Sequence, residues 1–223
     1  MNLDLQHLAN GLVFFVLLLF SLSFHESAHA WAALKMGDDT AARLGRISLN
    51  PIVHIDPIGT LLLPLVQILS SGTVFFGWAK PTPYNPANFD RKHSLAKGHV
   101  RVAAAGPLSN FVLAFLFAIA LAIALRYGAA RNGLTTSILA GAISLNIGLA
   151  LFNFVPLPPL DGSKVALFGL PRSFGEAYDR YVTPYGALIL LMLVATGAIS
   201  RILAPFNAII LTILSSIIAA IAS

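Results

Sequence analysis

The chain has no cysteine among its 223 residues, which excludes disulfide bonds and thiolate metal ligands. Charged residues are also scarce, at 10% of the chain, whereas a typical soluble domain carries about 25%. Hydrophobic residues make up 57% of the chain, and the mean hydropathy is +0.81. This composition argues against a soluble domain, and any metal ion would have to be held by His, Asp or Glu.

Acidic residues are fewer than basic ones, 9 against 14, which gives a net charge of +5 and a pI of about 9.8. No nucleic-acid-binding motif accompanies this basic excess. In a membrane protein, Lys and Arg gather in the cytoplasmic loops. We therefore expect the lipid bilayer as a partner and no nucleic acid.

The predicted fold class is an all-α polytopic membrane protein with about five transmembrane helices, because a span needs about 20 mostly apolar residues. The apolar run 60–69 is too short for a span and contains a proline, which favours a re-entrant segment. The letters RISL, at 46–49, predict a short β element. The predicted spans are 8–35, 100–126, 135–155 and two stretches within 184–222.

The distribution of basic residues predicts the orientation in the membrane. If the run 60–69 enters and leaves on one side, eleven of the 14 Lys and Arg residues share one face, and only Arg126, Arg131 and Arg201 lie opposite. A full span there would remove most of this asymmetry. The positive-inside rule thus favours the re-entrant arrangement, with the N-terminus outside. The first ten residues lack the basic region of a signal peptide, so we expect the first helix to be retained.

One polar cluster, His25, Glu26 and His29, interrupts the first apolar helix. Residues four apart lie on one face of a helix, so the two imidazoles can bind one zinc ion. Glu26 lies beside that face, where it can take a proton from an activated water and pass it to a leaving amine. HESAH matches the H-E-x-x-H pattern of zinc peptidases. The alternative is a polar helix end at the membrane interface, although each ionisable residue within a span costs about 3 kcal/mol.

A third metal ligand must be sought elsewhere, because catalytic zinc sites usually use three protein ligands. Asp161 is the acid at the junction of a full-length apolar helix and a sharp turn, on the same predicted side as His25 and His29. Gly162 permits a tight backbone there. The alternative is a simple Asp-Gly turn acid.

Three motifs, HESAH, GPLSN and FNFVPLPPLDG, together resemble the site-2 protease family of intramembrane zinc metalloproteases. Their order and rough spacing agree with the family pattern over residues 8–165. The matching residues are His25, Glu26 and His29, then Gly106, Pro107 and Asn110, and then Asn153, Pro156, Leu160, Asp161 and Gly162.

The resemblance implies one zinc ion per chain, held by His25, His29 and Asp161, with Glu26 as the general base. It also implies that Asn153 supports the substrate or the oxyanion, although this amide is equally suited to a hydrogen bond between helices. The sequence departs from many family members, because no helix fits before the H-E-x-x-H helix and there is no room for a PDZ or CBS domain. A minimal enzyme is therefore expected.

His54 lies beside the predicted site and is a possible accessory residue, with loop packing as the alternative. We expect residues 1–223 to form a single membrane-embedded protease domain, with 8–165 as the catalytic core and two further spans in 184–222. The strand-like 46–49 is expected to help hold the substrate extended.

The predicted function is an intramembrane zinc endopeptidase of a prokaryotic cell membrane. It would cut transmembrane or membrane-anchored protein substrates near the cytoplasmic side. A metal-binding or transport protein remains an alternative, although transporters usually show paired halves. An inactive helix-binding scaffold is the other, although such a scaffold has no need of Glu26. The substrate, the trigger and the oligomeric state stay open.

Overall fold

A computed structural model of the chain describes residues 5–71, 77–92 and 94–223. Within these ranges the chain is mainly helical and contains no strand, so the all-α class is confirmed. The long helices are α1 (Leu5–Lys35), α4 (Leu95–Arg126), α5 (Leu134–Asn153) and α9 (Ala198–Ala222). The short helices are α2 (Thr40–Arg43), η1 (Pro51–His54), η2 (Pro57–Leu62), α3 (Leu63–Ser71), η3 (Pro86–Asn88), α6 (Asp161–Gly169), α7 (Arg172–Tyr181) and α8 (Gly186–Ala195).

The four long helices are the ones in the described chain that are apolar and long enough to cross a membrane. Their mean hydropathies lie between 1.7 and 2.5. Much of their surface is exposed and apolar, as in Leu116 on α4 and Ile209 on α9. A helix hydrophobic around most of its circumference is typical of a membrane span. The protein is therefore an integral membrane protein.

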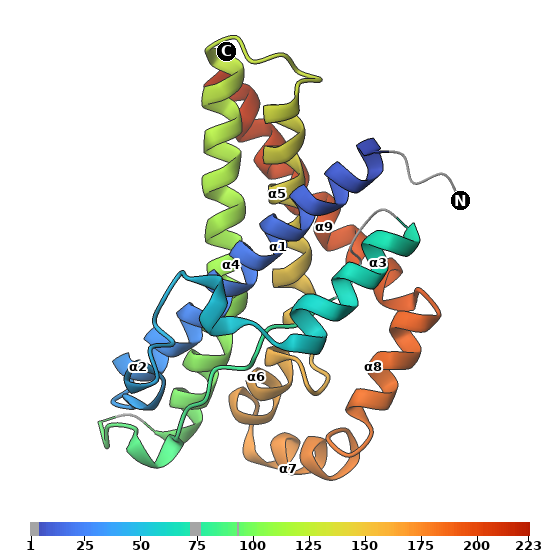
Figure 1. Ribbon diagram of the computed structural model, residues 1–223. Coiled ribbons are helices and arrows are strands. Elements are labelled where there is room, and N and C mark those ends of the chain that lie inside the picture. The colour runs from blue at the N-terminus through green and yellow to red at the C-terminus, as the bar shows by residue number, and fades with distance from the viewer. Residues whose placement is uncertain (1–4, 72–76, 93) are drawn as a thin grey trace.

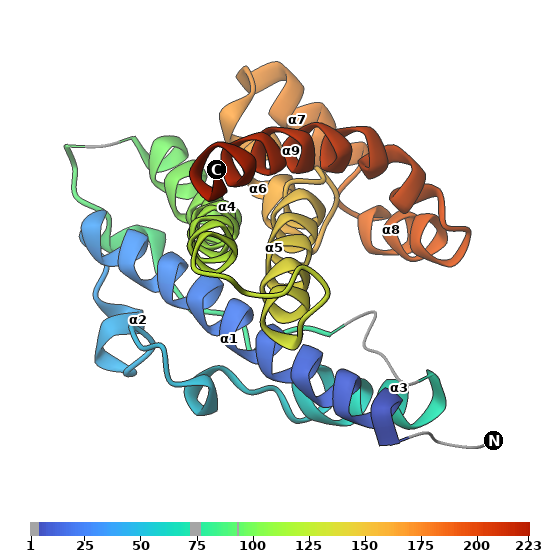
Figure 2. The same ribbon diagram turned by 90° about the horizontal axis from the view of Figure 1, so that it is seen from above.

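Helices α4 and α5 run side by side and form the middle layer of the molecule (Figure 1). Seen from above, α1 with α3 lies on one side of this pair and α9 lies on the other (Figure 2). Small residues on α4, Ala114 and Ala118, are fully buried and let Ile143 and Ile147 of α5 approach closely. Helices α2, α6 and α7 gather at one end of the layers (Figure 1).

The residues that precede and follow the apolar segment beginning at Pro57 lie next to each other. The Trp78 amide donates to the Gly59 carbonyl over 3.1 Å, and the Lys80 amide donates to the His54 carbonyl over 2.9 Å. The chain therefore enters and leaves this short segment at one place, in agreement with the predicted re-entrant arrangement.

The predicted β element at 46–49 is wrong, because these residues form no strand. Their polar groups are used locally instead. The Arg46 amide donates to the Ala41 carbonyl, and the Ser48 carbonyl accepts from the His54 imidazole. Such bonds to a nearby helix and to a side chain leave no ladder for a neighbouring strand.

Among the described residues, four helices rather than about five are long enough to span a membrane, because α8 has ten residues. Gly197 ends the run of α8 with a left-handed backbone (φ 68°), and α9 begins after it. The end of α9 meets the end of α4, where Arg126 Nη1 donates to the Ile221 carbonyl over 2.9 Å. Arg201 is 20 residues earlier on α9, which is about 30 Å along a helix. Arg201 therefore lies far from Arg126 along α9, whereas the charge count predicts that Arg126, Arg131 and Arg201 share one side of the membrane.

Asp38, fully buried after the end of α1, joins that end to the loop around η3. Its carboxylate accepts from the Thr40 hydroxyl, from the Asn85 amide over 2.6 Å and from Asn88 Nδ2 over 2.9 Å. Burial alone would raise the pKa of Asp38, but these hydrogen bonds outweigh it and hold the pKa below its usual range. The ionised form therefore stabilises the fold.

Replacing this carboxylate should destabilise the protein at neutral pH. We expect Asp38→Asn to lower the free energy of unfolding by about 1–3 kcal/mol, because an amide cannot accept all three bonds. Since the pKa is depressed in the fold, this contribution is complete above about pH 4 and is lost as the pH falls through the folded-state pKa. Melting curves in detergent at several pH values measure it. The matched variant Asp39→Asn removes only an exposed pair with Arg43 and should have little effect.

Candidate active site

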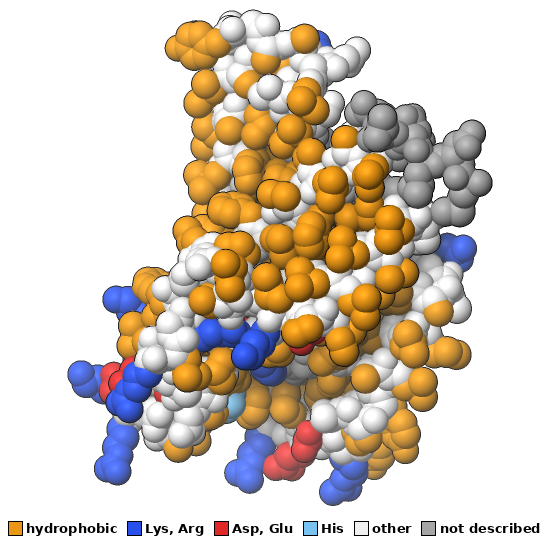
Figure 3. All heavy atoms as spheres, viewed as in Figure 1, with side chains coloured by type: hydrophobic (Ala, Val, Ile, Leu, Met, Phe, Trp, Pro, Cys, Tyr) orange, Lys and Arg blue, Asp and Glu red, His pale blue; other side chains and the backbone are white. Residues whose placement is uncertain are grey.

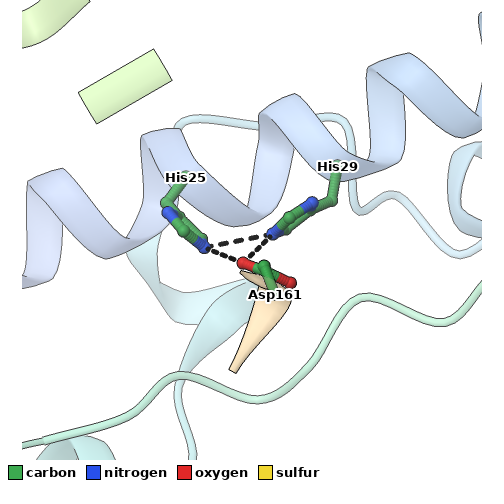
Figure 4. Close-up of side chains that lie close together, drawn as sticks. All are labelled: His25, His29 and Asp161. Atoms are coloured by element: carbon green, nitrogen blue, oxygen red, sulfur yellow. Dashed lines mark hydrogen bonds and ion pairs between the residues drawn. The ribbon is translucent and has the colours of Figure 1, made fainter. Parts of the chain in front are cut away.

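His25 and His29 project from one face of α1 and are both buried, at 4% and 7% exposure. Their Nε2 atoms lie 3.0 Å apart (Figure 4). The helical spacing of four residues explains this meeting, since one turn stacks the first side chain above the second. The predicted pairing of the two imidazoles is thus present in the structure.

Asp161 comes to the two histidines from the first residue of α6, across 132 residues of sequence (Figure 4). Its Oδ2 atom lies 3.1 Å from the Nε2 atom of each histidine. Gly162, the residue after Asp161, packs directly against the end of α5, where a Cβ atom would lie 2.3 Å from the Phe154 carbonyl oxygen. Only glycine fits there, so Gly162 allows α6 to start close to the end of α5 and thereby places Asp161 in the site.

The three donor atoms form a set that suits zinc. In a tetrahedral site with bonds of about 2.0 Å, neighbouring ligand atoms lie about 3.3 Å apart, close to the spacings observed here. Each histidine also has an acceptor at its other nitrogen. Nδ1 of His25 lies 2.7 Å from Asn110 Oδ1, and Nδ1 of His29 lies 2.7 Å from the Val102 carbonyl. Both acceptors favour the tautomer with the proton on Nδ1, which leaves Nε2 of each imidazole as the nitrogen that can bind a metal ion.

Gly106 on α4 lies directly against the two imidazoles. A Cβ atom there would be 2.3 Å from His29 Nε2 and 2.6 Å from His25 Nε2. Van der Waals contact requires more than 3 Å, so any side chain would push the two nitrogens apart. The glycine of GPLSN thus keeps the space that a metal ion and its ligands need.

Glu26 is held at the edge of the same site by the extended segment 77–84. The Thr82 amide donates to Glu26 Oε2 over 2.8 Å, and the Thr82 hydroxyl donates to the Glu26 carbonyl over 3.0 Å. The first bond orients the carboxylate, and the second ties the segment to the backbone of α1.

Arg46 fixes the segment 77–84 from the other side. Its guanidinium is 5% exposed and donates to the backbone carbonyls of Val53, Lys80 and Pro81. A buried cation that binds only carbonyl groups ties two loops together, because each bond to a charged group is stronger than a neutral one. Arg46 therefore supports the position of Thr82 against Glu26.

A pocket of about 830 Å³ opens beside these residues. Its walls are mostly apolar and come from α1, α5, α8, α9 and the segment 77–84. His25, Glu26, His29 and Asp161 lie on its surface, and so does Lys164 one turn after Asp161. A mostly apolar cavity with a few convergent polar groups is the usual form of a binding site.

The structure places the two other predicted residues differently. Asn153 lines the pocket, and its Nδ2 atom donates to the Leu149 carbonyl over 2.9 Å. His54 does not line the pocket. It is 2% exposed, its Nε2 atom donates to the Ser48 carbonyl over 2.8 Å, and burial lowers its pKa. This is the packing arrangement that had been the alternative for His54.

Three residues in or behind the site carry no functional prediction from the sequence: Arg46, Thr82 and Asn146, a residue of α5 whose Oδ1 atom accepts from Asn110 Nδ2 over 2.9 Å. Thr82 carries a signal, since it stands between two prolines that leave it the only backbone donor in PTP. Arg46 lay in the predicted strand and had been counted only as a charge. Asn146 is one polar residue in a long apolar helix, and an intramembrane amide deserves the same attention as an intramembrane charge.

Filling the space at Gly106 should destroy the metal site while leaving the fold intact. We expect Gly106→Ala to weaken zinc binding by at least about tenfold, because the methyl group separates the ligand atoms. Zinc content after purification, measured by atomic absorption, tests this. Gly141→Ala on α5 is the matched control, because a Cβ atom there meets nothing within 4 Å. Equal zinc content in the two variants would contradict the prediction.

Two curated proteins are similar to the chain over most of its length. The "Putative zinc metalloprotease YwhC" of Bacillus subtilis (strain 168) is 41% identical over 194 residues, which cover 85% of this chain and 83% of that protein. The "Putative zinc metalloprotease Rip2" of Mycolicibacterium smegmatis is 28% identical over 186 residues, which cover 82% of this chain and 66% of that protein. No family model and no solved structure matches the chain. With its HESAH and LDG motifs and its membrane-spanning helices, the chain belongs to the site-2 protease-like family of zinc metalloproteases.

Proposed function

We propose that this protein is an intramembrane zinc endopeptidase that cuts transmembrane or membrane-anchored protein substrates. The observation that carries the proposal is the convergence of His25 Nε2, His29 Nε2 and Asp161 Oδ2 within 3.1 Å, beside Glu26 in one pocket. The metalloprotease names of both relatives support it. We assign one zinc ion to each chain and the catalytic core to residues 8–165.

Zinc held by these three donors would supply a Lewis acid that polarises the scissile carbonyl and acidifies water. Glu26 is then the general base: it takes the proton from the attacking water and passes it to the leaving amine. The hydrogen bond from Thr82 engages Oε2 of Glu26 and leaves Oε1 for this transfer. Because the carboxylate is already oriented, little reorganisation is needed during the reaction.

A substrate segment must unwind before cleavage, because the amides of a helix are shielded by their own hydrogen bonds. The pocket is suited to such a segment. Leu190 and Val194 of α8, with Leu203 of α9, form an apolar wall opposite α1, and the segment 77–84 lies extended along the site. Apolar walls accept the side chains of a transmembrane sequence, while the polar groups gather at the zinc donors.

Asn153 is the candidate support for the tetrahedral oxyanion. It lies on the pocket surface at the end of α5, eight residues before Asp161. Its amide nitrogen has a second hydrogen, beyond the one donated to the Leu149 carbonyl. A donor directed at developing negative charge lowers the reaction barrier.

We place the active site toward the cytoplasmic side, with the N-terminus outside. Most Lys and Arg side chains visible in the space-filling view lie at the end that carries α2, α6 and α7 (Figure 3). Basic residues favour the cytoplasmic side of a membrane. Asp161 begins α6 at that same end (Figure 1).

Glu26→Gln should abolish cleavage and retain zinc. We expect the turnover of a model transmembrane peptide in liposomes to fall by about 100-fold or more, since general-base catalysis contributes about that much. Zinc content should be unchanged, because Glu26 is not among the three donors. Glu176→Gln is the matched control, since Glu176 forms only an exposed pair with Arg172.

Three outcomes of this experiment separate the competing functions. Zinc retained with cleavage lost supports the peptidase. Full activity of Glu26→Gln would refute the role of Glu26. Zinc binding without cleavage in the wild-type protein, across several peptides, would favour a metal-binding or scaffold protein instead.

The orientation can be tested by single cysteines, because the natural chain has none. We expect Asn132→Cys, between α4 and α5, to react with a membrane-impermeant maleimide on intact cells. Ser173→Cys on α7 should react only after permeabilisation. Both positions are exposed, so a failure to react reports sidedness and not burial. The reverse pattern would overturn the proposed orientation.

A further inference from the structure

A chain of amides is buried between α1, α4 and α5, next to the zinc donors. Asn110 of α4 and Asn146 of α5 are both 0% exposed, and Ser21 of α1 is 1% exposed. An unpaired amide in such surroundings is costly, so each polar atom here needs a partner. All three residues lie on helices that cross the membrane.

The hydrogen bonds along this chain run in one direction. Asn146 Nδ2 donates to the Ala142 carbonyl over 2.9 Å and to Ser21 Oγ over 3.0 Å. Asn110 Nδ2 donates to Asn146 Oδ1 over 2.9 Å and, more weakly, to the Ser21 carbonyl over 3.4 Å. Asn110 Oδ1 then faces His25 Nδ1 at 2.7 Å.

The Ala142 carbonyl determines which way the hydrogen bonds of this chain point. A backbone carbonyl can only accept, so the Ala142 carbonyl requires the NH₂ end of Asn146 and turns its oxygen toward Asn110. That oxygen in turn requires the NH₂ end of Asn110, which turns the Asn110 oxygen toward His25. An oxygen at this place requires the proton of His25 on Nδ1, and leaves the Nε2 lone pair toward Asp161 and His29.

We propose that Asn146 is a positioning residue for the metal site: its amide fixes the orientation of Asn110 and, through it, the tautomer of His25. Asn146 forms no hydrogen bond with the zinc donors and does not line the pocket, and its link to His25 runs through Asn110. The inference rests on the proposed zinc site and adds a determinant from a third helix to it.

A purely structural role predicts a different result. Asparagine often joins membrane helices by hydrogen bonds, and in that role its loss weakens packing without changing an imidazole. The two roles can be distinguished by two quantities that a change in helix packing alone does not alter. These are the zinc dissociation constant and the proton position on His25.

The decisive variants are Asn146→Leu and Asn146→Asp. Leucine keeps the branching at Cγ and removes the acceptor for Asn110. We expect it to weaken zinc binding by about tenfold or more, as loss of a partner behind a ligand usually does. An uncharged carboxylic acid offers one O–H donor and one carbonyl acceptor. It can donate to the Ala142 carbonyl and accept from Asn110, so Asn146→Asp should keep most of the affinity.

Ser21→Ala provides a further discrimination. It removes one acceptor of Asn146, but the Ala142 carbonyl still sets the direction of the chain. The zinc dissociation constant should therefore change by less than about threefold. Ser23→Ala, also on α1, is the matched control, since Ser23 bonds only within its own helix.

Zinc affinity is measured in detergent by competition with a chelator, and the His25 tautomer by ¹⁵N NMR of histidine-labelled, zinc-free protein. We expect Asn146→Leu to raise the share of His25 with its proton on Nε2. Wild-type affinity and tautomer in folded Asn146→Leu would overturn the proposal, and so would equal losses in the Leu and Asp variants. His29→Ala tests the zinc site itself: if it binds zinc as the wild type does, the proposed function fails independently of Asn146. If Asn146→Leu does not fold, loss of affinity in Asn146→Asp decides against the proposal.

Discussion

The close approach of α1 to α4 is the constraint on which the site depends. His25 and His29 lie four residues apart on α1, and the groups that receive them on α4 repeat with the same spacing, at Val102, Gly106 and Asn110. The helices run in opposite directions, so the first histidine meets the last of these residues. One face of α4 thus supplies an acceptor for each imidazole and, between the acceptors, the empty space at Gly106. If the helices separated, both acceptors would be lost together with the alignment of the Nε2 atoms.

The remaining parts of the molecule complete a site that these two helices begin. Helix α6 begins at Asp161, and the close contact of Gly162 with the end of α5 holds this start of α6 beside the histidines. The re-entrant segment and its return carry Thr82 to Glu26, with Arg46 binding the backbone on both sides of that loop. Each addition comes from a break in regular structure, where backbone groups are free to bind side chains.

The sequence alone predicts the all-α membrane class, the long helices and the meeting of His25, His29 and Asp161. Those predictions rest on local patterns: apolar runs, a helical spacing of four and a motif that ends a helix. Prediction from the sequence failed where the role of a residue depends on a partner distant in the chain. RISL has the composition of a strand, but Arg46 within it binds carbonyls up to 35 residues away. The run after Pro184 has the composition of a span, but the left-handed Gly197 ends α8 after ten residues.

The segment beside Glu26 restricts the backbone hydrogen bonds that a polypeptide lying along it can form. Pro81 and Pro83 have no amide hydrogen, so the three residues from Pro81 to Pro83 carry a single backbone donor, on Thr82, and Glu26 already accepts it. A polypeptide lying against this stretch finds no hydrogen to accept. It can pair there only through its own N–H groups, which excludes an ordinary two-way ladder. A proline lying opposite would have no N–H group to offer, so it could form no backbone hydrogen bond with this edge.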